Sequence, residues 1–228
     1  MIEVHYRKTA IIVGVLFIVA TAASLAASLL LNPVVNATDY LTSVSANANQ
    51  LIAGVLFDLV AAISVVLIAA MMFPILKRFH EGIAAGYLGL RTIEAVTFLP
   101  NIICTLLLLT LSREYVSAGA PASSSFQMSG TLLLGVREWV FPLNPIIAGT
   151  GMLLFNYLLY QSRLIPQWLS IWGLLGATLV MVAGLIGLFG DFLYPLAVPI
   201  AVQEMALAVW LIVKGFSPIN ATRGGATS

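Results

Sequence analysis

The chain has 228 residues, of which 61% are hydrophobic and only 8% are charged, and its mean hydropathy is +1.04. Soluble domains contain roughly 45–50% apolar and about 25% charged residues, so this composition excludes a soluble globular protein. The formal net charge of +1 provides no basic surface for nucleic acid. The single cysteine, Cys104, excludes an internal disulfide and a metal site built from several cysteines.

Hydropathy predicts a set of long apolar helices and little else. The predicted spans are residues 10–31, 51–76, 83–111, 128–160, 168–190 and 193–213. Each run supplies the roughly 20 residues that a helix needs to cross a bilayer. The expected fold is therefore all-α, a six-helix transmembrane bundle over residues 1–216, embedded in lipid. Residues 217–228 are expected to form a flexible polar tail.

Cationic residues accumulate on one side of this predicted topology. The connections at 77–82 and 161–167, together with the two ends of the chain, carry seven lysines and arginines, whereas the opposite loops carry only Arg113. Cytoplasmic loops are the ones enriched in lysine and arginine. We therefore expect both termini to be cytoplasmic and the loops at 32–50 and 112–127 to face outward.

The fourth run, at residues 128–160, is longer than a membrane crossing requires. About 33 residues in one helix measure about 50 Å, whereas the hydrocarbon core is roughly 30 Å thick. We expect this segment to protrude, to tilt strongly, or to break near Pro142 and Pro145.

Six ionisable residues fall inside the predicted spans rather than at their ends. They are Asp58, Arg91, Glu94, Arg137, Glu138 and Glu204. A charge that faces lipid costs at least about 2.5–3.5 kcal/mol, so we expect these side chains to face the interior and to find partners there.

Counting residues from each turn predicts the depth of these groups, because residues equally distant from the turn of an antiparallel hairpin lie level, at about 1.5 Å per residue. One predicted layer contains Asp58, Arg137 and Glu138 with Asn101. The other contains Arg91, Glu94 and Glu204 with Asn144. The two layers are expected about 15 Å apart, and together they are the candidate lining of a ligand site or ion path.

Helical geometry restricts the pairs that can form in the second layer. Arg91 and Glu94, at positions i and i+3, share a helix face and are predicted to pair. Glu204 is predicted to be a second partner of Arg91, so that the guanidinium bridges two carboxylates.

The first layer follows a different rule, because Arg137 and Glu138 are adjacent and adjacent residues on a helix point about 100° apart. Arg137 is therefore predicted to reach Asp58 on another helix. Glu138 is then expected to interact with Asn101, with a backbone group or with water.

Two interpretations of these charges remain open. Buried ion pairs sometimes only fix the register of packed helices. However, each layer has one carboxylate in excess, and a buried carboxylate without a partner holds a proton or attracts a cation. The expected function is an internal polar pocket or path for a small solute, a cation or a proton, as in a transporter.

Alternatives from other functional classes also remain. One is a structural or regulatory subunit that binds another membrane protein or a second copy of the chain. Another is an intramembrane enzyme that uses Glu or Asp as acid and base, for which no individual catalytic residue is proposed. The only histidines, His5 and His80, lie near helix ends, so neither a metal site nor a haem is expected. No cofactor is expected.

Three stretches carry a resemblance to a known family. They are GYLGLRTIE at 86–94, RLIPQWLSIWG at 163–173 and QEMALAVWLIVKGF at 203–216. The chain resembles, over essentially its whole length, the bacterial integral membrane family catalogued as domain of unknown function 4386. The resemblance implies a multi-pass protein of the cytoplasmic (inner) membrane of a prokaryote. It supplies no activity and no site residues.

Overall fold

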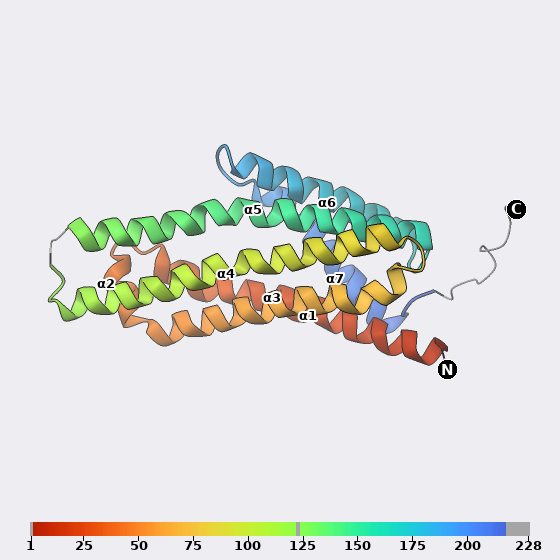
Figure 1. Ribbon diagram of the computed structural model, residues 1–228, viewed down its shortest axis with the longest axis horizontal. Coiled ribbons are helices and arrows are strands. Elements are labelled where there is room, and N and C mark those ends of the chain that lie inside the picture. The colour runs from red at the N-terminus through yellow and green to blue at the C-terminus, as the bar shows by residue number, and fades with distance from the viewer. Residues whose placement is uncertain (1, 122–123, 218–228) are drawn as a thin grey trace, which may run out of the picture.

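The computed structural model describes residues 2–121 and 124–217, and all of its regular structure over these residues is helical (Figure 1). The helices are α1 (Ile2–Val35), α2 (Tyr40–Ala46), α3 (Ala48–Leu76), α4 (Glu81–Ser117), α5 (Ser124–Ser162), α6 (Gln167–Gly187) and α7 (Val198–Val213), with a 3-10 turn, η1 (Tyr194–Ala197), directly before α7. The polar tail expected at 217–228 lies, except for residue 217, outside the described residues.

Within the described residues, six helical segments are long and apolar enough to cross a membrane. They are α1, α3, α4, α5, α6 and the continuous segment formed by η1 and α7. The prediction of an all-α, six-span membrane protein is therefore confirmed. Apolar composition decides this outcome, since only helices satisfy their own backbone groups inside lipid.

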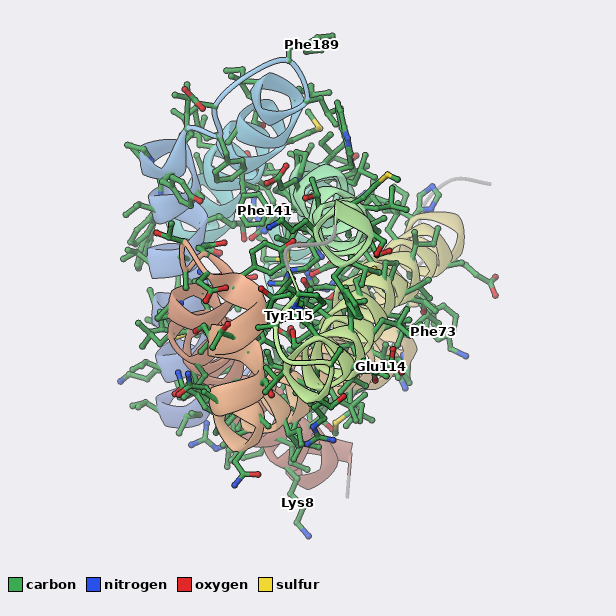
Figure 2. The ribbon with its side chains drawn as sticks, turned by 90° about the vertical axis from the view of Figure 1, so that its left-hand side faces the viewer. Lys8, Phe73, Glu114, Tyr115, Phe141 and Phe189 are labelled. Atoms are coloured by element: carbon green, nitrogen blue, oxygen red, sulfur yellow. The ribbon has the colours of Figure 1, made fainter. Side chains whose placement is uncertain are left out.

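The six spans form a closed ring. Each long helix packs against the next one along the chain, and α7 packs back against α1, so the order around the ring is α1, α3, α4, α5, α6, α7 (Figure 2). In this order α4 lies across the ring from α7. Side chains from these two helices can therefore meet in the interior although the helices are not neighbours.

The two ends of the bundle differ. We call the end at which α1 begins and α7 ends the terminal end, and the opposite end the far end; α4 and α5 reach further toward the far end than α6 does (Figure 1). Gly187, at the end of α6, lies against Pro142 of α5. The first part of α5, up to about that level, therefore has no α6 beside it.

The fourth span is one continuous helix that includes its two prolines. Helix α5 runs for 39 residues through Pro142 and Pro145. Of the outcomes expected from its length, a break is wrong, and the helix instead extends past the end of α6. Its neighbour α4, which is 37 residues long, extends with it and covers one side of it.

Helix α2 occupies part of the segment at 32–50 that was expected to be only a loop. It packs against α4 at the far end, where Leu41 and Val44 are buried in an apolar cluster with Leu108 and Leu109. Seven residues are too short for a hydropathy window to detect. Their apolar pair at i and i+3 shares one helix face, which is the face buried against the far-end cluster.

An aromatic group marks the level at which α6 ends. The ring of Phe192 lies 5.1 Å from that of Phe141 and 5.0 Å from that of Tyr194, measured between centroids. Phe189 projects away from the bundle beside them and is 93% exposed (Figure 2). Aromatic side chains of this kind concentrate at membrane interfaces.

Candidate functional site

Helix α4 carries a row of polar side chains along its interior face. We call this the α4 polar row, and its members are Tyr87, Arg91, Glu94, Thr97, Asn101 and Thr105. Their spacing of three or four residues keeps them on one face of the helix. The opposite face carries exposed apolar residues such as Ile93, Val96 and Ile103. The row is about 27 Å long and therefore spans most of a bilayer.

Arg91 and Glu94 form the ion pair that their spacing predicts. Arg91 Nη1 donates to Glu94 Oε2 at 2.8 Å, and the two side chains are only 4% and 8% exposed. The stem of Arg91 lies against Gly151 of α5, so that a Cβ at this glycine would be in ordinary van der Waals contact with it. The charge of Arg91 is thus matched by a residue on its own helix.

Glu204 enters the same region from α7. It is half-buried and lies on the interior face of α7, between the buried residues Ile200 and Leu207. It interacts electrostatically with both Arg91 and Glu94. In the part of the chain that the structure describes, however, no ion pair joins Glu204 to Arg91. The predicted bridge is therefore incomplete: α7 lies across the ring from α4, and Glu204 interacts with Arg91 electrostatically without forming an ion pair.

These three groups form what we call the interior acid site (Arg91, Glu94 and Glu204). One guanidinium faces two carboxylates, an excess of one negative charge. Such an excess in a medium of low dielectric constant is unfavourable unless a proton or a cation balances it.

Tyr87 adjoins the interior acid site on the terminal side. Its side chain is completely buried, and its ring stacks on that of Phe155 from α5, with centroids 4.9 Å apart. It interacts electrostatically with Arg91 and Glu204. Its hydroxyl makes no hydrogen bond to any described residue.

Asn144 lies one helical turn further toward the far end than predicted. Its Nδ2 donates to Thr97 Oγ1 at 2.7 Å, and Thr97 Oγ1 donates in turn to the backbone carbonyl of Glu94 at 2.7 Å. Asn144 thus sits between the two predicted layers rather than in contact with the interior acid site. It connects α5 to the turn of α4 that holds Glu94.

The first predicted layer, that of Asp58 and Arg137, is present around Asp58 of α3. Asn101 Nδ2 donates to Asp58 Oδ2 at 2.8 Å, and Asp58 is buried. Arg137 interacts electrostatically with Asp58, but its hydrogen bond goes to Thr105 Oγ1. Thr105 Oγ1 also donates to the carbonyl of Asn101 at 2.7 Å. The predicted Arg137 bridge to Asp58 is therefore indirect, and Thr105 and Asn101 stand between the two charges.

Glu138 does not join this layer and lies exposed on α5, next to Trp139, which is 66% exposed. The cause is the angle of about 100° between adjacent helical residues. With Arg137 turned toward α4, Glu138 points out of the ring, at a level that α6 does not reach. The expectation that Glu138 faces inward is wrong.

The sequence-based candidates are charged residues and the asparagines level with them, and they do not include the hydroxyl groups of α4. Tyr87, Thr97 and Thr105 all occupy the interior face of α4. The signal that reveals them is the spacing of three or four residues counted in both directions from Arg91.

A second polar group lies between α5, α6 and α7, and it was also missed. We call it the amide cluster (Asn156, Ser170 and Gln203), and all three residues are completely buried. Gln203 Nε2 donates to Asn156 Oδ1 at 3.3 Å and to the carbonyl of Leu169 at 3.2 Å. A Cβ on Gly173 would overlap the amide of Asn156, so α6 approaches α5 this closely only because residue 173 is glycine.

The described residues contain no group of three or more His, Cys, Asp or Glu side chains that could hold a metal ion. The chemistry available inside the ring is that of carboxylates, a guanidinium, amides and hydroxyls. These groups bind protons, small cations and water.

The sequence profile of the family described as domain of unknown function (DUF4386) matches residues 12–215. The chain belongs to this family. No curated protein and no solved structure matches it. All six spans of this DUF4386 protein, and every residue of the interior acid site, lie within the matched region or begin just before it.

Proposed function

We propose that this DUF4386 protein takes up a proton or a small monovalent cation at the interior acid site and passes it along the α4 polar row during transport across the membrane. The observation that carries the proposal is the position of Glu204. This carboxylate faces an ion pair that is already complete between Arg91 and Glu94.

The charge balance supports uptake of one positive charge. Because Arg91 is engaged at 2.8 Å by Glu94, its charge is not free to neutralise Glu204 as well. Glu204 is half-buried, whereas Glu94 is buried, so Glu204 is the more accessible of the two carboxylates. Ionisable residues inside membrane proteins commonly serve as proton or ion sites.

The α4 polar row supports a route from this site toward the far end. Glu94 is linked through Thr97 to Asn144, and one turn further Asn101 contacts Asp58. Successive turns of a helix are about 5.4 Å apart. Chains of carboxylates and hydrogen-bonding groups at such intervals are typical of proton relays.

Apolar clusters at both ends favour a relay or a gated path over an open pore. Toward the terminal end, Phe17, Tyr87 and Phe155 pack together in the interior. Toward the far end, Leu41 and Val44 of α2 pack with Leu108 and Leu109 of α4, which follow the last residue of the row.

We further propose that the protein resides in the cytoplasmic membrane of a prokaryote with its terminal end in the cytoplasm. Lys77, Arg78, Arg163 and Lys214 lie at the terminal end, which supports this orientation by the positive-inside rule.

Proton flux into vesicles tests the proposed function. Purified protein is reconstituted into liposomes that contain a pH-sensitive dye, and a potassium diffusion potential set by valinomycin drives proton entry. We expect Glu204→Gln to reduce the flux at least tenfold. Glu138→Gln is the matched control, because it makes the same change at an exposed position, and it should leave the flux at the wild-type value.

Two results would overturn the proposal. One is wild-type protein that carries no more flux than empty vesicles, with sodium, potassium and ammonium as well as protons. The other is Glu204→Gln protein that incorporates normally and retains the wild-type flux.

The hydrogen bonds between α4 and α5 favour one alternative, a structural or regulatory subunit. Asn144 and Arg137 each donate to a threonine of α4, at Thr97 and Thr105, which locks the register of the two longest helices. A partner protein or a second copy of the chain would then be the functional ligand. In that case substitutions in the row change the thermal stability and the co-purifying partner, and no flux is measured.

A further inference from the structure

Seven buried side-chain polar atoms of the described residues lack a hydrogen-bonding partner, and three of them lie toward the terminal end on completely buried residues of α4, α6 and α7. These three are the hydroxyl oxygens of Tyr87 and Ser170 and the side-chain carbonyl oxygen of Gln203. More than about nine in ten buried polar groups in proteins have a partner, which is either protein or ordered water. Atoms of this kind therefore indicate that a bound molecule supplies the missing hydrogen-bonding partner.

Two of these atoms belong to the amide cluster. Gln203 donates through Nε2 to Asn156 and to the carbonyl of Leu169, the residue directly before Ser170. These bonds use the donors of Gln203 and leave its Oε1 as a free acceptor. Ser170 lies three residues after Gln167, where α6 begins, so this group is close to the terminal end.

The third atom, the hydroxyl oxygen of Tyr87, belongs to a ring that packs against α5, the helix that also carries Asn156 of the amide cluster. Tyr87 stacks on Phe155 at 4.9 Å between centroids, and Phe155 directly precedes Asn156. Tyr87 also lies in the field of Glu204, which directly follows Gln203. Helices α4, α5, α6 and α7 thus converge on one region beside the interior acid site.

Helices α5, α6 and α7 pack closely in this region, and no described group supplies a partner for these three atoms. Gly173 lies directly against the amide of Asn156, and a Cβ on Gly176 would lie 2.9 Å from the backbone nitrogen of Ile200. Small molecules that donate and accept hydrogen bonds are the remaining partners. Buried water fits this need, because it commonly makes about three hydrogen bonds to such groups.

We infer that ordered water molecules bind between α4, α6 and α7 on Tyr87, Ser170 and Gln203, and that they join Glu204 to the terminal end. The second part of this inference rests on the proposed function. The α4 polar row leads from the interior acid site toward the far end, and the water molecules form the part of the route that leads toward the terminal end.

Two substitutions that each remove one oxygen test the water site. Tyr87→Phe keeps the ring that stacks on Phe155, and Ser170→Ala keeps the close packing of α6. Thr178→Val is the matched control, since Thr178 is exposed on α6 and its hydroxyl bonds to its own helix through the carbonyl of Leu174. For each variant, the thermal unfolding temperature in detergent and the proton flux into vesicles are measured.

We expect Tyr87→Phe and Ser170→Ala each to lower the unfolding temperature and to reduce the proton flux at least fivefold, because bound water loses a ligand. Thr178→Val should change neither quantity. An equal or higher unfolding temperature with wild-type flux overturns the inference, because removal of a hydroxyl from dry packing is neutral or stabilising.

The same series separates this inference from the proposed function. If Glu204→Gln stops the flux while Tyr87→Phe and Ser170→Ala match wild type in both measurements, the proposed function stands and the inference of bound water is overturned. If Glu204→Gln retains the flux, the proposed function fails. A lower unfolding temperature of Tyr87→Phe and Ser170→Ala, relative to Thr178→Val, then still supports bound water at these residues.

Discussion

Glu204 of α7 faces Arg91 of α4 across the interior of the ring, while Glu94 holds the guanidinium of Arg91 at 2.8 Å. The arginine therefore has a close partner from its own helix and a distant one from the opposite side of the bundle. A clamp whose only task is to join two helices would place its ion pair between them. Here the ion pair lies within α4, and the carboxylate that comes from the other helix is left facing it.

Removal of one partner of the buried ion pair should be far more harmful than removal of both. Arg91→Met leaves two buried carboxylates without a cation, and we expect it to lower the free energy of unfolding by about 3–5 kcal/mol. Arg91→Met combined with Glu94→Met should recover most of that loss, because apolar residues of similar volume replace a buried pair at little cost. Thermal unfolding of the single and double variants in detergent measures the coupling. Equal losses for both would show that the pair is not buried as described.

The hydroxyl of Thr105, which accepts a hydrogen bond from Arg137, should contribute to the stability of the protein. Thr105→Val keeps the shape of the side chain and removes the oxygen that accepts from Arg137, so we expect a loss of about 1–3 kcal/mol of stability. Thr110→Val is the matched control, since Thr110 is an exposed threonine of the same helix whose hydroxyl bonds to its own backbone. Chemical or thermal unfolding of both variants gives the comparison, and equal stabilities would contradict the contact between Arg137 and Thr105.

The glycine that lies against Asn156 should not tolerate a methyl group. Gly173→Ala places a Cβ onto the amide of Asn156, and the expected loss is about 1–3 kcal/mol, as for other overpacked sites. Gly89→Ala makes the same change inside α4, where no atom lies within 4 Å of the new Cβ. It should be neutral or stabilising by roughly 0.5–1 kcal/mol, because alanine is the better helix former. The ratio of folded to aggregated protein after heating reports both effects, and similar behaviour of the two variants would contradict the close α5–α6 contact.

The orientation in the membrane can be tested with single cysteines. Cys104 is buried and is first replaced by alanine, after which Lys77→Cys or Arg113→Cys places one exposed thiol at the terminal end or the far end, respectively. With the terminal end in the cytoplasm, a membrane-impermeant maleimide should label position 113 in intact cells. It should label position 77 only after permeabilisation. The reverse pattern would show that the positive-inside bias misleads for this chain.

The amino-acid sequence is sufficient for the number of spans, the all-α class and the pairing of Arg91 with Glu94. Each of these properties depends on local information. Hydropathy over about 20 residues decides whether a segment enters lipid, and the i, i+3 spacing decides which side chains share a helix face. Depth counting also brings Asp58 of α3 level with Asn101 of α4, although between α4 and α5 it is off by one turn for Asn144.

The tertiary structure decides the contacts that depend on rotation about a helix axis and on which helices face each other. Counting along the chain predicts the depth of Glu138 but not that its side chain points away from the ring. It also brings Glu204 level with Arg91, but it does not show that the two residues lie on opposite sides of the interior. It also cannot detect the amide cluster, which forms only because glycines let α6 approach α5 and α7 closely. The physical reason is that depth follows from residue number alone, whereas facing and distance follow from how all six helices pack around one interior.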